Sequence, residues 1–220
     1  QHHFGQALVR TPNNFGFKSD PPTHPKLLDW LAAEFMEPTG AGGEPWTLKR
    51  LHKLIMTSDS YRQQSIHPKE TDYTERDFLN RNWWKFNRHR LNSESLRDAM
   101  LSVSGRLNLK MSGPSFYPKM SGEALEGLSR KSSDWKDSTP GEQSRRSIYM
   151  MTKRSRLLPL MTAFDFSDTT ITCGQRDVTI VAPQALALLN NHFAHSQSEA
   201  LAKRLAGQAG NTAGQIKLAW

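Results

Sequence analysis

The sequence predicts a mainly α-helical protein, an irregular helical domain with long loops and at most a small β element. Apolar residues recur at helical spacing in several segments, and capping residues or glycines mark the ends of those segments. Long stretches rich in Gly, Pro and Ser separate them. Hydrophobic residues make up 36% of the 220 residues and charged residues 23%, so polar connections should occupy much of the chain.

The clearest helix is expected over residues 92–107. Asn92 or Ser93 can accept hydrogen bonds from the free amides of the first turn, and Gly105 can adopt the left-handed conformation that ends a helix. One face carries an apolar stripe at helical spacing, which is expected to face the core. Its members are Leu96, Met100, Val103 and Leu107.

The opposite face of this helix is charged. Glu94, Arg97 and Asp98 fall within one sector together with Leu101, and a leucine there indicates that the charges lie under another part of the chain. One interpretation is a structural ion network formed by Arg90, Glu94, Arg97 and Asp98. The other is a pair of carboxylates, Glu94 and Asp98, placed for acid and base catalysis.

Two shorter helices are predicted in the N-terminal part, over residues 27–36 and from Thr47 to Ile55, joined by a Gly- and Pro-rich loop. Residues 58–64 suggest a further helical turn. The arrangement is typical of a helical hairpin, and its loop is longer than the turn of a DNA-reading helix-turn-helix. Residues 80–90 mix basic and aromatic side chains, a pattern found both in single-strand binders and in salt-bridged cores.

The C-terminal part is expected to be less regular. Residues 108–144 form a long excursion whose Tyr117 and Trp135 either line a groove or pin the loop to the body. Residues 147–152 have β character. A helix should begin near Pro183 and present Leu186, Leu189 and Phe193 on one face. The expected organisation is one domain over 1–207, part of a longer protein, followed by a flexible tail over 208–220.

The net charge of +8 favours an acidic partner. A basic face for binding anions or a partner is expected at Arg145, Arg146, Lys153, Arg154 and Arg156. The expected partner is an acidic neighbouring domain or an anionic polysaccharide, whereas nucleic acid is not expected. No apolar run reaches the length of a membrane span, and no signal peptide precedes the chain as given.

Three remaining residues, Asp165, Asp168 and Cys173, carry side chains that could act in catalysis or bind a metal. Asp165 and Asp168 are further candidate carboxylates for a hydrolase, but their spacing matches no complete calcium loop, so no metal site is predicted and turn capping is the favoured role. Cys173 is the single cysteine, which excludes a disulfide within the chain. It is expected to be a small buried hydrophobe rather than a nucleophile.

Several separate segments together resemble one known family, the planctomycete-specific domain of unknown function 1553, over nearly the whole chain from His3 to about Gly207. Each segment alone is a weak signature, but their order is specific. They include residues 25–32 (PKLLDWLA), 48–55 (LKRLHKLI), 58–63 (SDSYRQ), 94–98 (ESLRD), 145–149 (RRSIY) and 183–190 (PQALALLN).

This resemblance implies an exported or periplasmic multidomain protein in which such a domain follows a cytochrome c-like domain. It supplies no established activity and no catalytic residues. The chain lacks a Cys-x-x-Cys-His motif, so no cofactor is expected within it, and haem c would belong to a domain outside it. The leading hypothesis is therefore a non-catalytic interaction or scaffold module. A polysaccharide hydrolase is the alternative, and a nucleic-acid binder with a basic face is a further one.

Overall fold

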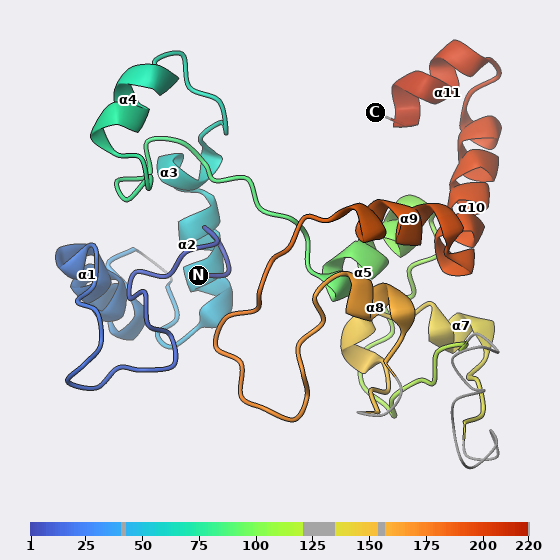
Figure 1. Ribbon diagram of the computed structural model, residues 1–220, viewed down its shortest axis with the longest axis horizontal. Helices are drawn as coiled ribbons and strands as arrows, with labels where there is room; N and C mark the ends of the chain where they lie inside the picture. The colour runs from blue at the N-terminus through green and yellow to red at the C-terminus, as the bar shows by residue number, and fades with distance from the viewer. Residues whose placement is uncertain (41–42, 121–134, 154–156, 220) are drawn as a thin grey trace. The chain divides into compact units, whose positions relative to one another are not determined.

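The computed structural model describes residues 1–40, 43–120, 135–153 and 157–219, and these residues are mainly helical, as the sequence predicts (Figure 1). Within these ranges there is no extended strand. Two isolated parallel bridges, Asn108 with Arg145 and Phe116 with Met150, are the β element. The chain divides into two compact units, Gln1–His89 and Arg90–Trp220. They are called unit 1 and unit 2 below.

Unit 1 contains four helices in the described residues, and all but α4 match predicted ones. Helix α1 spans Pro25–Met36 and α2 spans Leu48–Met56. Helix α3, Asp59–Arg62, is the predicted helical turn, and the Ser58 side chain caps it by accepting from the amide of Tyr61. Helix α4 spans Glu70–Arg76. The hairpin is tied by an ion pair of 2.7 Å between Glu34 of α1 and Arg50 of α2.

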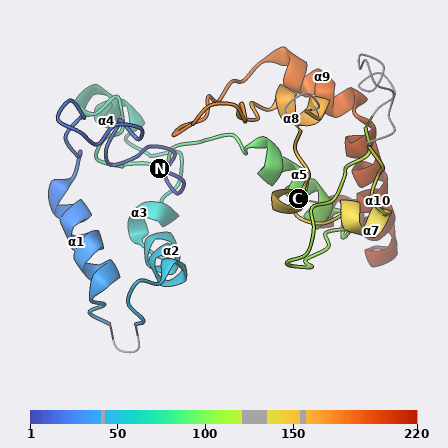
Figure 2. The same ribbon diagram turned by 90° about the horizontal axis from the view of Figure 1, so that it is seen from below.

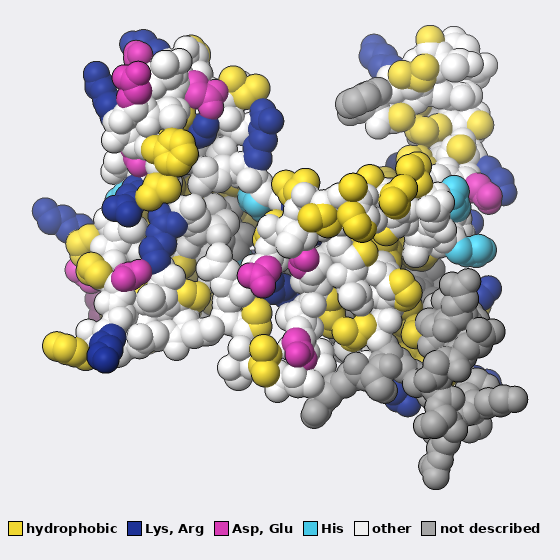
Figure 3. Space-filling view, in the orientation of Figure 1, with side chains coloured by type: hydrophobic (Ala, Val, Ile, Leu, Met, Phe, Trp, Pro, Cys, Tyr) yellow, Lys and Arg dark blue, Asp and Glu magenta, His cyan; other side chains and the backbone are white. Residues whose placement is uncertain are grey.

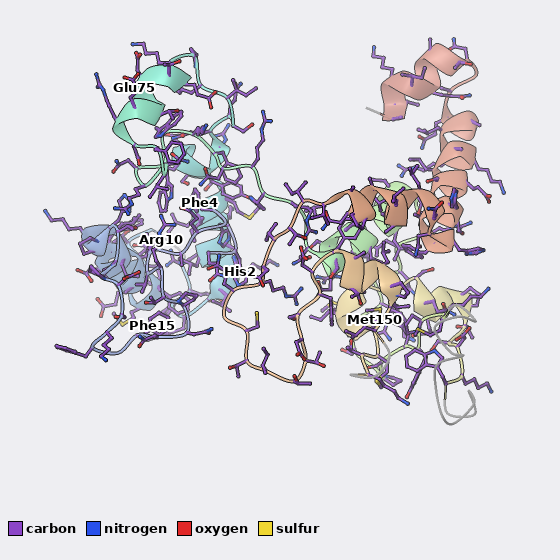
Figure 4. The ribbon with its side chains drawn as sticks, viewed as in Figure 1. His2, Phe4, Arg10, Phe15, Glu75 and Met150 are labelled. Carbon is purple, nitrogen blue, oxygen red and sulfur yellow. The ribbon has the colours of Figure 1, made fainter. Side chains whose placement is uncertain are left out.

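Aromatic rings fill the interior of unit 1, where Phe4 lies among them (Figure 4). Trp83 is stacked between two rings, with centroid distances of 4.6 Å to Phe4 and 5.0 Å to His24. Tyr61 and Phe86 meet edge to face. The mixture of basic and aromatic residues at 80–90 therefore places its aromatic members in packing contacts, the second of the two interpretations given above.

Unit 2 is organised around α5, Ser93–Val103. Helices α8 (Pro159–Ala163) and α10 (His192–Gln208) and the 3-10 turn η1 (Ser147–Tyr149) contact it. Helix α9, Ala182–Asn190, lies beside α8 (Figure 2). The unit is completed by α7, Pro140–Gln143, and α11, Thr212–Ala219. Helix α11 lies in the segment for which the sequence suggests a flexible tail, and the expected boundaries of 1–207 and 208–220 stay a prediction.

The start of α5 is where the sequence places it, but its C-terminal end and its core-facing side are different. Asn92 caps the helix by accepting from the amide of Ser95 at 2.8 Å, and Gly105 has a φ of +75°. The helix ends at Val103 rather than Leu107, and Val103 is 52% exposed. The buried residues are instead Ser93, Arg97, Leu101 and Ser104. Ordinary hydrophobic spacing could not predict this because two serines and an arginine occupy the buried face.

One further expectation is wrong. Residues 147–149 form a 3-10 turn instead of a strand, because the amide of Met150 bonds back to the carbonyl of Ser147. Helix α9 begins near Pro183 as predicted, but it ends at Asn190, so Phe193 lies on α10. On α9, Leu186 and Leu189 are 57% and 66% exposed, whereas Gln184 is buried. Hydrophobic side chains are accordingly gathered over α9 on the surface of unit 2 (Figure 3).

Candidate functional site: the charged face of helix α5

Arg97 is the centre of the charged face, and it is only 4% exposed. Its guanidinium donates to the carbonyl of Arg145 at 3.0 Å, to the Ser147 hydroxyl at 3.2 Å and to the carbonyl of Gln143. It also lies 5.2 Å from the ring centroids of Phe116 and Phe193. Burial lowers the pKa of Arg97 to about 10, so the group remains charged at neutral pH and holds the 143–147 segment on the helix.

Asp98 holds the same segment from the adjacent turn. One of its carboxylate oxygens accepts from the amide of Ser147 at 2.8 Å and from the Ser147 hydroxyl at 2.7 Å. The same oxygen lies 3.5 Å from the guanidinium of Arg97. Asp98 therefore caps the 3-10 turn η1, and its acceptor atom is already occupied by groups of the protein.

Glu94 forms a bidentate ion pair with Arg176, a residue 82 positions further along the chain. The two bonds measure 2.7 and 2.9 Å, and a third bond of 3.0 Å comes from the Ser93 hydroxyl. Partial burial raises the pKa of Glu94, but the hydrogen bonds from Arg176 and Ser93 outweigh it and place this pKa below its usual range. The pairing fastens the loop before α9 to the beginning of α5.

Arg90 and Asp165 form a second long-range ion pair, with a distance of 2.5 Å. Asp165 also accepts from the amide of Thr179 at 2.8 Å and from its hydroxyl. The amide bond from Thr179 is the main reason that the pKa of Asp165 lies below its usual range, with Arg90 contributing. Asp168 accepts from the amide of Thr170 at 2.7 Å, which is the geometry of a turn cap.

These contacts bring the four residues of the expected ion network together only in part. Arg97 and Asp98 share the 143–147 segment, while Arg90 and Glu94 reach to separate partners, Asp165 and Arg176. Sequence reasoning missed Arg176 as the partner of Glu94, 82 positions away, and Thr179 as a partner of Asp165, 14 positions away, since the local pattern links neither pair. A general acid needs a raised pKa to hold its proton at neutral pH, and the pKa values of Glu94 and Asp165 are lowered instead.

The expected basic face must be corrected at one position. Arg145 is fully buried, and its guanidinium donates to the carbonyls of Ser112 at 2.5 Å and Pro114 at 3.0 Å and to the carboxylate of Glu142 at 3.0 Å. It stacks on the Tyr149 ring at 4.1 Å. An arginine with these partners is not available to an outside anion. Sequence alone could not show this, because adjacent arginines at 145 and 146 look equivalent.

The other members of that face are placed differently. Arg146 is exposed, and Lys153 is half-buried with its ammonium 5.7 Å from the Trp135 ring. Arg154 and Arg156 lie outside the described residues, as does part of the 108–144 excursion that a hydrolase would use as a lid. Trp135 is buried and donates to the carbonyl of Pro118 at 3.0 Å, so this side chain pins the excursion instead of lining a groove.

Two further features bear on chemistry. Cys173 is exposed, contrary to the expectation of a buried residue, and its thiol donates to the carbonyl of Gln175 at 3.2 Å. A shallow hollow of about 450 Å³ lies elsewhere in unit 2, lined by Arg106, Asn108, Pro140, Gly141 and Ser144. None of the candidate carboxylates lines it.

A protein-family model matches residues 1–220 of the chain. The family is described as PSD1, protein of unknown function (DUF1553). The chain belongs to this family. No curated protein and no solved structure matches it.

The described residues of this DUF1553 chain contain neither a membrane-spanning helix nor a metal-binding cluster. None of the helices there is both long and apolar enough to cross a membrane. Within the same residues, no cluster of three or more His, Cys, Asp or Glu side chains is arranged to hold a metal ion. The candidate site is thus a set of paired charges on α5 whose partners are other parts of the same chain.

Proposed function

We propose that this DUF1553 chain is a non-catalytic interaction module of an exported, haem c-associated multidomain protein. The setting is the one that the family resemblance implies. The observation that carries the proposal is the state of the candidate carboxylates: Glu94, Asp98 and Asp165 all accept hydrogen bonds or ion pairs from side chains of the chain itself. Groups committed in this way stabilise a fold and leave little capacity for proton transfer to a substrate.

The partner that we propose is acidic, either a neighbouring domain or an anionic polysaccharide. The net positive charge is larger in unit 2. Unit 2 has seventeen Lys and Arg residues and eleven Asp and Glu residues, whereas unit 1 has twelve and ten. Arg146 is exposed at the edge of η1, and Lys153 lies a few residues further along. Surface charges of one sign attract a partner of the other sign and fix its orientation.

The proposal is tested by charge reversal on this face. Binding to immobilised oligogalacturonate, an anionic polysaccharide, and to poly-glutamate, an acidic polypeptide, is measured for the wild type and for the double variant Arg146→Glu/Lys153→Glu at low salt. Loss of two attractive charges and introduction of two repulsive ones should weaken binding at least about tenfold. The probe that the wild type prefers identifies the class of partner.

A matched control separates a defined face from net charge. Lys203→Glu/Lys217→Glu changes the same number of charges at exposed positions on α10 and α11 and should leave most of the affinity intact. Equal losses in both double variants, or no binding by the wild type to either probe, would contradict the proposal. Release of reducing ends from the polysaccharide that disappears in Glu94→Gln would favour a hydrolase instead.

A further inference from the structure

Two histidine side chains in unit 1 share a hydrogen bond. The Nε2 atom of His3 lies 2.9 Å from the Nδ1 atom of His52, which belongs to α2, and their ring centroids are 4.9 Å apart. A protonated imidazole has two donors and no acceptor. The bond therefore exists only while at least one of the two rings is neutral, and it is lost when both carry a charge.

This hydrogen bond connects the first residues of the chain to the body of unit 1. The neighbouring Phe4 stacks on Trp83, and the amide of Gly5 bonds to the carbonyl of Gln1 at 2.7 Å. Further on, the amide of Thr23 donates to the carbonyl of Leu8 at 2.8 Å. Residues 1–8 are thus held to the rest of unit 1 at His3, Phe4 and Leu8, and the contact at His3 is the one that depends on the protonation of imidazole.

Among the described residues, no carboxylate acts on the pKa of His3. Tyr61 of α3 faces His3 edge to face at a centroid distance of 6.2 Å. Partial burial lowers the pKa of His3 below its usual range, and His52 and His2 lower it further. A histidine whose pKa is lower in the folded than in the unfolded chain stabilises the fold above the unfolded value of about 6.5. That stabilisation is lost as the pH falls through the folded value.

We propose that the His3–His52 hydrogen bond is an acid-sensitive latch that holds residues 1–8 on α2. Protonation of both rings replaces the hydrogen bond by repulsion between two charges at the same position. Residues 1–8 then detach from α2 more often, and the face of Trp83 that Phe4 covers becomes accessible to solvent. The latch is independent of the proposed anion-binding face, which lies in unit 2.

Hydrogen exchange in the full chain tests the latch. Exchange of the peptide that covers residues 1–10 is followed at pH 7.5 and pH 5, corrected for the intrinsic pH dependence of exchange. A peptide from α10 serves as the internal reference. Protection of the first peptide should fall about fivefold more than protection of the reference, the factor expected for loss of one hydrogen bond.

Two substitutions assign the effect to the pair. His52→Gln keeps a donor and an acceptor at this position but cannot become charged, so the additional loss of protection at pH 5 should disappear. His67→Gln removes another imidazole of unit 1, one that packs on Tyr73. This variant should still show the full loss of protection at pH 5. His3→Gln repeats the first test from the other side if His52→Gln does not fold.

Either of two results would overturn the proposal. The first is a wild-type peptide 1–10 whose protection changes no more than that of the α10 reference. The second is a loss of protection at pH 5 that persists unchanged in His52→Gln and His3→Gln.

Discussion

Unit 1 and unit 2 bury different kinds of groups. Among the described residues of unit 1, only Glu34 and Asn80 are buried, and a cluster of aromatic rings is half-buried. Its members are Phe4, Tyr61, Trp83 and Phe86. Unit 2 buries a hydrophobic set that includes Leu101, Phe116 and Met161. It also buries two arginines, Arg97 and Arg145, which are 4% and 0% exposed.

The difference shows how the irregular segments between the helices satisfy their buried backbone groups. Carbonyl groups of such segments need donors when they leave water. In unit 2 two buried arginines supply those donors, Arg97 to Gln143 and Arg145 to Ser112 and Pro114. Unit 1 has a single comparable arginine donor in the described residues, Arg50 to Glu34, and otherwise relies on ring stacking. Unit 2 should therefore be most sensitive to loss of a guanidinium, and unit 1 to loss of a ring.

The largest expected effect is that of Arg145→Met. Methionine retains much of the apolar stem but leaves the carbonyls of Ser112 and Pro114 without this donor, while Glu142 keeps its ion pair with Lys110. A carbonyl that loses its donor on burial costs about 1–3 kcal/mol of unfolding free energy, and two are affected here. Denaturant unfolding measures the loss, and the exposed neighbour serves as the control, since Arg146→Met should change stability by no more than about 0.5 kcal/mol. Similar losses in the two variants would contradict the burial of Arg145.

A smaller effect is expected when a ring is removed from unit 1. Trp83→Ala deletes the ring between Phe4 and His24, and because Trp83 is half-buried the expected loss is about 2 kcal/mol, below the range for fully buried tryptophans. Trp30→Ala removes the same side chain from a position that is 48% exposed and should be nearly neutral. Denaturant unfolding of both variants, monitored by circular dichroism, tests the comparison. An equal loss in the two would show that stacking on Trp83 does not hold unit 1.

The smallest expected effect is on the pH dependence of stability, through the ion pair of Asp165. The pKa of Asp165 is lowered in the fold, so its pairing stabilises unit 2 above the unfolded value of about 3.9 and this contribution is lost as the pH falls through the lower folded value. Asp165→Asn removes the charge, and asparagine tolerates the φ of +56° at this position. The variant should be less stable than the wild type at pH 7, and the difference should shrink towards pH 3. A difference that does not depend on pH would assign the loss to packing instead.

The local features of the fold were predictable from sequence. Helical spacing, Asn92 as a cap and Gly105 as a stop predicted α5, and similar signals predicted α1, α2 and α9. Such signals depend on neighbours along the chain. Helix α5 uses its side-chain cap, and α1 and α9 have a proline in the first turn. The mainly helical fold and the family followed from the same segments.

The candidate site was less predictable because its partners are distant in sequence. Glu94 meets Arg176, and Arg90 meets Asp165, pairings that no spacing rule indicates. The apolar stripe from Leu96 to Leu107 suggested the core-facing side of α5, yet Arg97 is buried on another side, where it donates to backbone carbonyls. A hydropathy pattern counts arginine as a surface residue and misses an arginine that satisfies buried carbonyls.

The measurement that tests the central claim most directly is the stability and activity of Glu94→Gln. This change keeps the shape of the side chain and removes the charge that pairs with Arg176. If the charged face of α5 is structural, unfolding free energy should fall by about 1 kcal/mol, a modest value because the pair is partly exposed to solvent. Binding to the preferred anionic probe should remain. A variant as stable as the wild type that had lost turnover of a polysaccharide would contradict the account.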